Sequence, residues 1–405
     1  MMFPRLCNQE AVYLLAGAVA LSLGGCQSDS AQATQRSVSC VARHPSASTG
    51  ELQACAGDLS GKVDAALKPL LAQAGVTAAT IAIFKGDTPL LEQAFGHRDA
   101  AATVPLPADA LFMTASIIKP VTAAAIQRLA RDGVLAMTDK VFCTEGNGRC
   151  WLALPASLPT HDPRLAEITI QHLLDHQGGW DATVSGDPLT EEAAIQQQLG
   201  LSTAPEQTDL MRAVLARPLD HAPGTRAAYS NFGYLLLGRI IEQAAKMPYI
   251  DYIRLAIFAP LGVPGRDIEA AKSRLKDRNP REPNYQTTVT APSVFEPGKV
   301  VSALDGAVRA ENWVAVGATI TTASAMAKFA GRYRIPDGKP LEGSNNGGFS
   351  GADPGVATVL RQLPSGISYA VMMNKLDEDH PEGEASLQMK VIRQVDAAIL
   401  AAGLN

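Results

Sequence analysis

The sequence predicts an α+β domain built on one antiparallel sheet, with helices at both chain ends and a large helical region inserted between them. An amphipathic segment followed by a hairpin pattern opens the domain after residue 58. A second hairpin pattern and a last amphipathic segment close it in the inverted order. Because the sheet needs strands from both ends of the chain, we expect one folding unit.

The opening elements lie between residues 58 and 96. Residues 58–75 place apolar side chains on one helical face: Val63, Ala66, Leu67, Leu70 and Leu71. The runs "AATIAIF" and "PLLEQAFG" flank the turn "KGD" and predict a β-hairpin. Residues 116–290 follow as a region rich in helix and loop patterns.

The closing elements mirror the opening ones. The runs "GVATVLRQL" and "ISYAVMMN" flank "PSG" and predict a second hairpin. A last helix carries Leu387, Val391, Val395 and Ile399 on one face. We expect the two terminal helices to cover one face of the sheet.

The first 58 residues read as a targeting segment and a tether. Arg5 precedes a short apolar run at 11–23, which ends in "LGGC" with Cys26. This ending resembles a bacterial lipoprotein box, in which the cysteine is lipidated; the alternative is an ordinary signal peptide. We therefore expect a lipoprotein signal peptide over 1–25, a tether over 26–58 and the domain over 59–404. The chain would lie on the periplasmic side of a bacterial membrane, held by a lipid anchor, with the choice of membrane open.

The four cysteines beyond Cys7 and Cys26 suit an exported protein. They form two local pairs, Cys40 with Cys55 and Cys143 with Cys150, and an even number predicts disulfides in an oxidising compartment. A metal site built from all four is the alternative. It lacks the close C-x-x-C spacing that zinc favours.

Composition and missing motifs exclude several function classes. The net charge of −5 implies no basic face and hence no nucleic-acid partner. There is no P-loop, no dinucleotide fingerprint and no G-x-S-x-G. His172 and His176 have a spacing that can bind metal on a helix, but H-E-x-x-H is absent. We expect no cofactor and no metal, and the oligomeric state is open.

The segment "FMTASIIKP" places a serine three residues before a lysine among apolar neighbours. On a helix, Lys119 would reach back beside the Ser116 hydroxyl. A desolvated lysine loses part of its preference for the charged form, so it can act as a base toward that serine. The alternative is a chance S-x-x-K.

Two further polar segments lie in otherwise apolar surroundings. In "YSNFGYLLLG", Tyr229 and Asn231 either project into the same cleft as Ser116 or serve only as packing residue and helix cap. In "SNNGGFSGADPG", glycines allow a substrate to approach a strand edge, whose N–H groups could bind an oxyanion. The alternative there is a surface loop.

The three segments in this order resemble the serine β-lactamase and penicillin-binding-protein superfamily. The similarity covers about 60–400 and is greatest to class C β-lactamases, D-alanyl-D-alanine carboxypeptidases and family VIII esterases. It implies the β-lactamase/transpeptidase-like fold and a nucleophilic Ser116 that forms an acyl-enzyme. Lys119 and Tyr229 would share the base role, and Asn231 would hold the lysine and the substrate. The oxyanion hole would use the N–H groups of Ser116 and Phe349.

The third motif departs from this family. It usually carries Lys or His, any residue, then Gly, and we align it with Asn346, Gly347 and Gly348. A neutral Asn346 weakens the case for recognition of a β-lactam carboxylate. The resemblance thus implies a hydrolase for esters, amides, D-amino-acid peptides or β-lactams, with a small or peptidoglycan-derived substrate. The alternative is a non-catalytic cell-envelope or penicillin-binding protein on the same scaffold.

Overall fold

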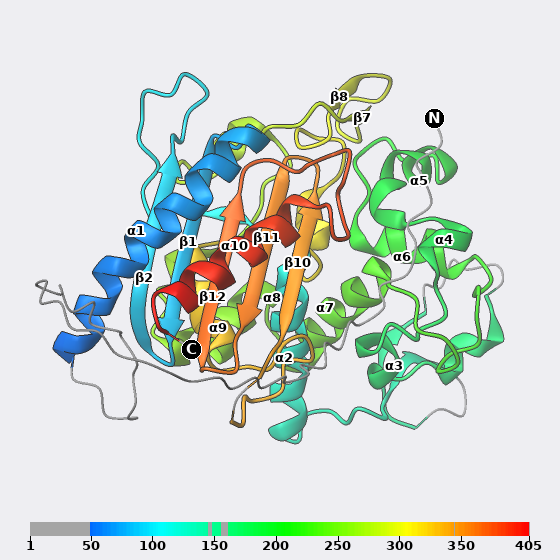
Figure 1. Ribbon diagram of the computed structural model, residues 1–405. Helices are drawn as coiled ribbons and strands as arrows, with labels where there is room; N and C mark the ends of the chain where they lie inside the picture. Colours follow the sequence, from blue (N-terminus) through cyan, green and yellow to red (C-terminus); the bar gives the residue numbers. More distant parts are fainter. Residues whose placement is uncertain (1–48, 145–147, 155–160, 344, 405) are drawn as a thin grey trace, which may run out of the picture.

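The computed structural model describes residues 49–144, 148–154, 161–343 and 345–404, with side chains from Asp58 onward. Its centre is an antiparallel sheet of five strands in the order β10-β11-β12-β1-β2 (Figure 1). The strands are β1 (Ala78–Lys85), β2 (Thr88–Gly96), β10 (Gly348–Asp353), β11 (Val356–Gln362) and β12 (Ile367–Met373). The predicted α+β architecture and both hairpins are confirmed.

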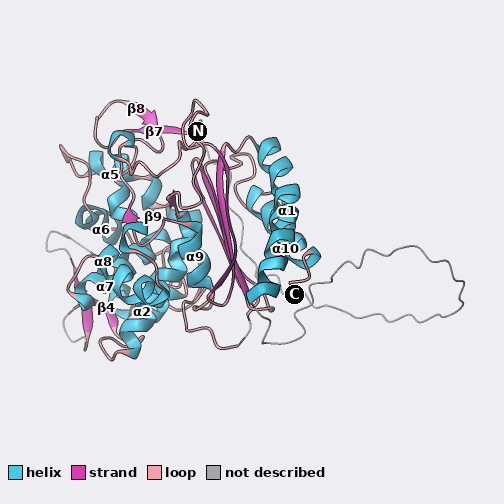
Figure 2. Ribbon diagram, turned by 90° about the vertical axis from the view of Figure 1, so that its left-hand side faces the viewer, coloured by secondary structure: helices cyan, strands magenta, loops and turns pink. Residues whose placement is uncertain are grey.

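The two terminal helices cover one face of this sheet. α1 (Thr49–Ala74) and α10 (Leu387–Ala401) lie together on that face, as Figure 2 shows from the side. Leu67 of α1 and Val391 of α10 are buried with the apolar side chains of the strands. This arrangement confirms the prediction from the two amphipathic segments. α1 begins at Thr49, so its first turns fall within the stretch expected as a tether.

The opposite face carries the helical insertion and the larger core. α2 (Lys119–Arg131), α7 (Asn231–Ala245) and α9 (Ala323–Ala330) pack there among mostly buried apolar side chains. The helix expected from Ser116 begins as a 3-10 turn, η1 (Ala115–Ile118), and becomes α-helical at Lys119. Pro120 is tolerated because it lies in the first turn of α2.

The remaining elements are short. The helices are α3 (Ile170–Leu174), α4 (Ala182–Ser185), α5 (Glu192–Gln198), α6 (Gln207–Leu215), α8 (Tyr249–Ile253), η2 (Pro163–Glu167), η3 (Pro188–Thr190), η4 (Arg254–Phe258), η5 (Ala259–Leu261), η6 (Gly265–Asp267), η7 (Leu275–Asp277) and η8 (Ala310–Trp313). The strands are β3 (Phe112–Met113), β4 (Lys140–Cys143), β5 (Cys150–Ala153), β6 (Ile268–Ala270), β7 (Thr290–Pro292), β8 (Val300–Ser302) and β9 (Thr319–Thr321).

One of the two expected disulfides is present. Cys143 and Cys150 are bonded and join β4 to β5. Cys26, Cys40 and the side chain of Cys55 lie outside the described residues, so the expected lipidation and the second pair stay predictions. Within the described part of the chain, no helix has the length and apolar character needed to cross a bilayer.

Candidate active site

The segment that carries Ser116 is held in a strained turn. Ala115 has φ +45°, a left-handed conformation that costs a non-glycine residue about 1–3 kcal/mol. Thr114 is fixed on both sides. Its N–H donates to the Thr319 carbonyl over 2.9 Å, and its own carbonyl accepts from Thr358 Oγ1 over 2.7 Å. Ser116 therefore stands in the first turn of η1, where a backbone N–H has no helical partner.

Lys119 is buried beside this serine, with 1% of its surface exposed. Its Nζ donates to Ser116 Oγ over 3.0 Å and to the Val316 carbonyl over 2.9 Å. Burial lowers the pKa of Lys119 to about 7, although the carboxylates of Asp187 and Asp353 act in the opposite direction. A large fraction of Lys119 is therefore neutral at neutral pH and able to accept a proton.

Tyr229 reaches the same hydroxyl from the other side. Its OH donates to Ser116 Oγ over 2.8 Å. Its ring centroid lies 4.7 Å from that of His176, whose Nδ1 accepts from the Ser230 N–H over 3.1 Å. Burial raises the pKa of Tyr229 above its usual value and lowers the pKa of His176 to about 3. Both rings are neutral at neutral pH, and His176 packs as a fixed support behind Tyr229.

Asn231 does not hold the lysine as expected. Its Nδ2 donates to Asp187 Oδ2 over 2.6 Å, and it makes no hydrogen bond to Lys119 in the described chain. The Lys119 ammonium is held by Ser116 and Val316 instead. The helix cap is Ser230, whose Oγ accepts from the N–H of Gly233. A contact between Asn231 and a substrate stays a prediction.

Backbone pairing decides which N–H groups of β10 are free. The Gln362 N–H donates to the Gly347 carbonyl over 2.8 Å, so these residues form a hydrogen-bonded pair of the antiparallel ladder. Such pairs alternate, and the register continues without a break to the end of β10. Phe349 and Gly351 therefore point their N–H groups at β11, whereas Ala352 points its N–H to the open edge.

The expected second oxyanion donor is therefore wrong. The N–H of Phe349 is used inside the sheet, and the strand residue beside the nucleophile is Gly351. A Cβ on Gly351 would lie 2.9 Å from the backbone N of Ser116 and 2.8 Å from the Thr114 carbonyl oxygen. The N–H groups that this geometry offers to a negatively charged oxygen are those of Ser116 and Ala352.

Asn346 and Gly348 are also misplaced by the alignment made from sequence. Asn346 Oδ1 accepts from Arg361 Nη1 over 2.9 Å, and Arg361 Nη2 contacts Asp396 of α10 over 3.2 Å. A Cβ on Gly348 would meet that same arginine side chain. Both residues lie toward α10, because the glycine-rich segment pairs three residues further along than expected.

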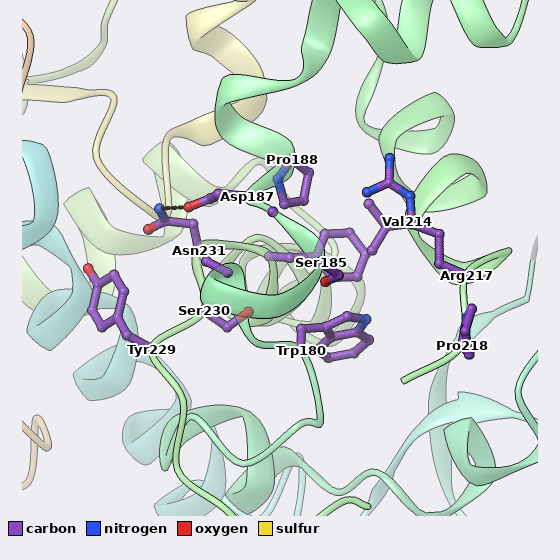
Figure 3. A pocket seen from close by; sticks show the side chains of 13 residues that line it. Trp180, Ser185, Asp187, Pro188, Val214, Arg217, Pro218, Tyr229, Ser230 and Asn231 are labelled. Atoms are coloured by element: carbon purple, nitrogen blue, oxygen red, sulfur yellow. Dashed lines mark hydrogen bonds between the residues drawn. The ribbon is translucent and has the colours of Figure 1, made fainter. Parts of the chain in front are cut away.

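A pocket adjoins this centre (Figure 3). Its walls come from the loop around α4, the end of α6 and the start of α7. They consist of Trp180, Ala182, Ser185, Gly186, Asp187, Pro188, Val214, Arg217, Pro218, Tyr229, Ser230, Asn231 and Phe232. Trp180 lines the pocket, and the edge of its ring packs against Phe232.

The comparison with known families agrees with this geometry. The model of the family described as "Beta-lactamase" matches residues 63–385 of the 405. This chain belongs to the beta-lactamase family. The match includes all the residues that surround Ser116, and it agrees with the resemblance found in the three segments.

Curated relatives of this chain carry different names within the family. Esterase EstB of Burkholderia gladioli is 29% identical over 273 residues, which are 60% of this chain and 65% of EstB. Penicillin-binding protein 4* of Bacillus subtilis is 30% identical over 195 residues, 45% of this chain and 36% of that protein. The chain thus aligns with less than two thirds of the length of these curated relatives.

Solved structures of similar fold cover most of the chain. The D-amino acid amidase of Ochrobactrum anthropi is 20% identical with a TM-score of 0.59, covering 85% of this chain and 98% of that one. A beta-lactamase/D-alanine carboxypeptidase of Yersinia pestis is 17% identical with a TM-score of 0.56, again over 85% and 98%. At these identities the likeness shows the fold alone.

The structure places the third motif of the beta-lactamase family at Phe349, Ser350 and Gly351. Phe349 is two residues from Gly351, so both face Ser116, and Phe349 packs against the central core. The position that usually carries Lys or His is therefore a phenylalanine. The neutral residue that replaces the usual Lys or His is therefore Phe349 and not Asn346.

Two residues of the site were not found from sequence. Asp187 follows a glycine and precedes a proline, a pattern that reads only as a helix cap, and its side chain does accept from the Leu189 N–H. Ala352 carries no side-chain signal, because only its backbone matters. His176 was named for its spacing from His172, and the structure gives it a packing role beside Tyr229 instead.

Proposed function

We propose that this protein is a serine hydrolase that works by acyl transfer through an ester of Ser116. One observation carries the proposal: the Ser116 hydroxyl lies 3.0 Å from a buried lysine amine and 2.8 Å from a tyrosine hydroxyl. A nucleophile held between a base and a proton donor is the arrangement that covalent catalysis needs. Esters, small amides and D-amino-acid peptides are the proposed substrates, and the family relatives named esterase and amidase support this range.

Acylation would begin with the neutral form of Lys119. Its Nζ takes the proton of Ser116 while Oγ forms a bond to the substrate carbonyl carbon. The carbonyl oxygen becomes an oxyanion, which the N–H groups of Ser116 and Ala352 would bind. As the tetrahedral intermediate collapses, the bond to the leaving group breaks. The leaving oxygen or nitrogen takes a proton from Tyr229 or from protonated Lys119.

Deacylation would follow the same path with water as the nucleophile. A water molecule loses a proton to the base, adds to the acyl carbon and releases the acid, and Ser116 Oγ recovers its proton. Lys119 fits the base role better than Tyr229. The pKa of the lysine is lowered to about 7 by burial, whereas burial raises the pKa of the tyrosine and keeps it protonated.

Export and lipid anchoring form a second part of the proposal. The apolar run and "LGGC" at residues 11–26 support a lipidated Cys26, and the Cys143–Cys150 disulfide supports an oxidising compartment. Membrane fractions of an expressing bacterium should contain the wild-type protein, and a Cys26→Ser variant should be recovered in the soluble periplasmic fraction. Wild-type protein in the soluble cytoplasm would contradict the anchor.

The activity can be tested with 4-nitrophenyl butyrate and a fluorescent penicillin. We expect the wild type to hydrolyse the ester, and Ser116→Ala to lose activity by several orders of magnitude while it stays folded. Ser60→Ala is a matched control, because Ser60 lies on α1 across the sheet. Intact-protein mass spectrometry should detect an acyl adduct on the wild type only.

The same experiment separates the competing class of function. Penicillin labelling or slow turnover of the ester that depends on Ser116 supports acyl transfer. A folded wild type that neither hydrolyses the ester nor becomes labelled would favour the non-catalytic binding protein.

A further inference from the structure

Asp187 is a carboxylate in the wall of the candidate site. It lines the pocket that adjoins Tyr229, and its carboxylate is bonded to Asn231, two residues further along the chain from that tyrosine (Figure 3). Its Oδ1 accepts from the Leu189 N–H over 3.0 Å, so the carboxylate is fixed in position. Asp187 and Tyr229 therefore line one pocket, and the hydrogen bond from Tyr229 to Ser116 joins that pocket to the nucleophile.

The bond to Asp187 fixes the orientation of the Asn231 amide. A carboxylate only accepts hydrogen bonds, so the NH2 group of Asn231 must face it. The amide oxygen Oδ1 is then the group left for a substrate. In the described chain it has no hydrogen-bond partner. Ser185, also in the pocket wall, donates its hydroxyl proton to Asp220 over 2.8 Å and presents an acceptor as well.

The acidic side chains near the nucleophile also favour a positively charged ligand. Two carboxylates, Asp187 and Asp353, lie within electrostatic reach of Lys119. Asp353 shares the Ser116 face of β10, because it is two residues from Gly351. Its carboxyl group makes no hydrogen bond or ion pair within the described residues. Burial raises the pKa of both carboxyl groups, that of Asp353 to about 7, and the charge of Lys119 acts in the opposite direction on each. When Lys119 is neutral and acts as a base, it no longer favours their charged form, and a cationic ligand would replace it.

We propose that the site selects acyl donors with an ammonium group close to the scissile carbonyl, and that Asp187 together with Asn231 Oδ1 binds this ammonium. An ammonium offers three donors and a positive charge to a wall of acceptors. A carboxylate-bearing substrate meets neutral Phe349 where a cation would be needed. The inference rests on the proposed acyl-transfer function and names its substrate class as amino-acid esters and amides with a free amino group.

The test uses substrates that differ in one group. Phenylalanine methyl ester, as each enantiomer, is compared at pH 7 with methyl 3-phenylpropanoate, which lacks only the amino group, and with N-acetylphenylalanine methyl ester. We expect kcat/KM of the wild type to be at least about tenfold higher for one enantiomer of the free amino ester than for either neutral ester. Asp187→Asn should lower that preference by about tenfold or more, because the amide removes the charge and keeps the shape.

Asp132→Asn is the matched control for net charge. Asp132 follows α2 at the end far from Lys119 and pairs with Arg128 at the surface. This variant should keep the wild-type preference. Should Asp187→Asn fail to fold, the wild type still gives an answer: phenylalaninol should inhibit hydrolysis of 4-nitrophenyl butyrate at least about tenfold more strongly than 3-phenylpropan-1-ol.

The outcomes distinguish this inference from the function beneath it. Ester hydrolysis that is absent, or that survives Ser116→Ala, overturns both. Hydrolysis that depends on Ser116 but treats the amino and deamino esters alike overturns the ammonium site only. A preference for the N-acetyl ester means that the acceptors bind a neutral amide N–H, which also overturns it. A preference for the amino ester that is unchanged in Asp187→Asn assigns the recognition to another group and refutes the role of Asp187.

Discussion

Adding one methyl group at Gly351 should lower activity much more than it lowers stability. The added Cβ would lie 2.9 Å from the backbone N of Ser116, about half an ångström closer than ordinary contact, and 2.8 Å from the Thr114 carbonyl oxygen. Both neighbours are backbone atoms in a turn already held from two sides, so the Ser116 N–H and the edge of β10 must move apart. Displacing one oxyanion donor costs about 2.7–4 kcal/mol, which is a loss of about 10²–10³ in kcat.

The cost to folding should be smaller. The same Cβ would lie 2.3 Å from Thr358 Oγ1, whose hydroxyl would then turn away and give up its hydrogen bond to Thr114. One such bond contributes about 0.5–1.5 kcal/mol to stability. We therefore expect Gly351→Ala to lower kcat for 4-nitrophenyl butyrate by two to three orders of magnitude. Because the methyl group also strains the backbone around it, the free energy of unfolding in urea should fall by about 1–3 kcal/mol.

Gly348→Ala is the control within the same strand. Its nearest neighbour would be Cδ of Arg361 at 3.3 Å, the stem of a side chain that can shift. Activity should stay within about threefold of wild type, since the change lies on the far face from Ser116. The reasoning about the register of β10 is refuted if Gly348→Ala is the damaging substitution and Gly351→Ala is nearly silent.

Three other predictions concern charge. The pKa of Lys119 is lowered to about 7, so its base form accumulates above that pH. We expect kcat/KM to rise about tenfold per pH unit below 7 and to level off above it. A flat profile from pH 5 to 8 would exclude this lysine as the base. Burial raises the pKa of Glu192 to about 7, so the folded state binds this proton more tightly than the unfolded state. The free energy of unfolding in urea should therefore fall by about 3 kcal/mol between pH 4.5 and pH 7. Glu192→Gln should remove most of this pH dependence. Phe349→Lys should raise kcat/KM for a penicillin relative to a neutral ester by about tenfold or more, whereas Asn346→Lys should leave that ratio unchanged, and the reverse result would restore the first alignment.

Sequence reasoning succeeded where a local repeat carries the information. The two hairpins follow from alternating apolar runs around short turns, and the terminal helices follow from apolar faces such as Leu387 to Ile399. The contact of Lys119 with Ser116 also follows from helical spacing, because residues three apart share a face.

The rest depended on pairings that no local pattern fixes. In "SNNGGFSGADPG" several glycines can end the third motif, and only the ladder with β11 shows that Gly351 is the one beside Ser116. The orientation of Asn231 depends on Asp187, which lies 44 residues earlier in a short irregular segment. Tertiary packing brings these two residues together, and no sequence pattern around either residue predicts that packing.

The pairing of β1 with β12 also determines which parts of the chain the candidate site needs. Ala79 pairs with Met373, so two neighbouring strands of the sheet are far apart in the sequence. Contacts of such long sequence separation form slowly, because a long loop has to close first. The Ala352 N–H that faces Ser116 is placed by the same late hairpin. Any fragment that lacks β10, β11 and β12 therefore carries Ser116 and Lys119 without the strand edge that would complete their site.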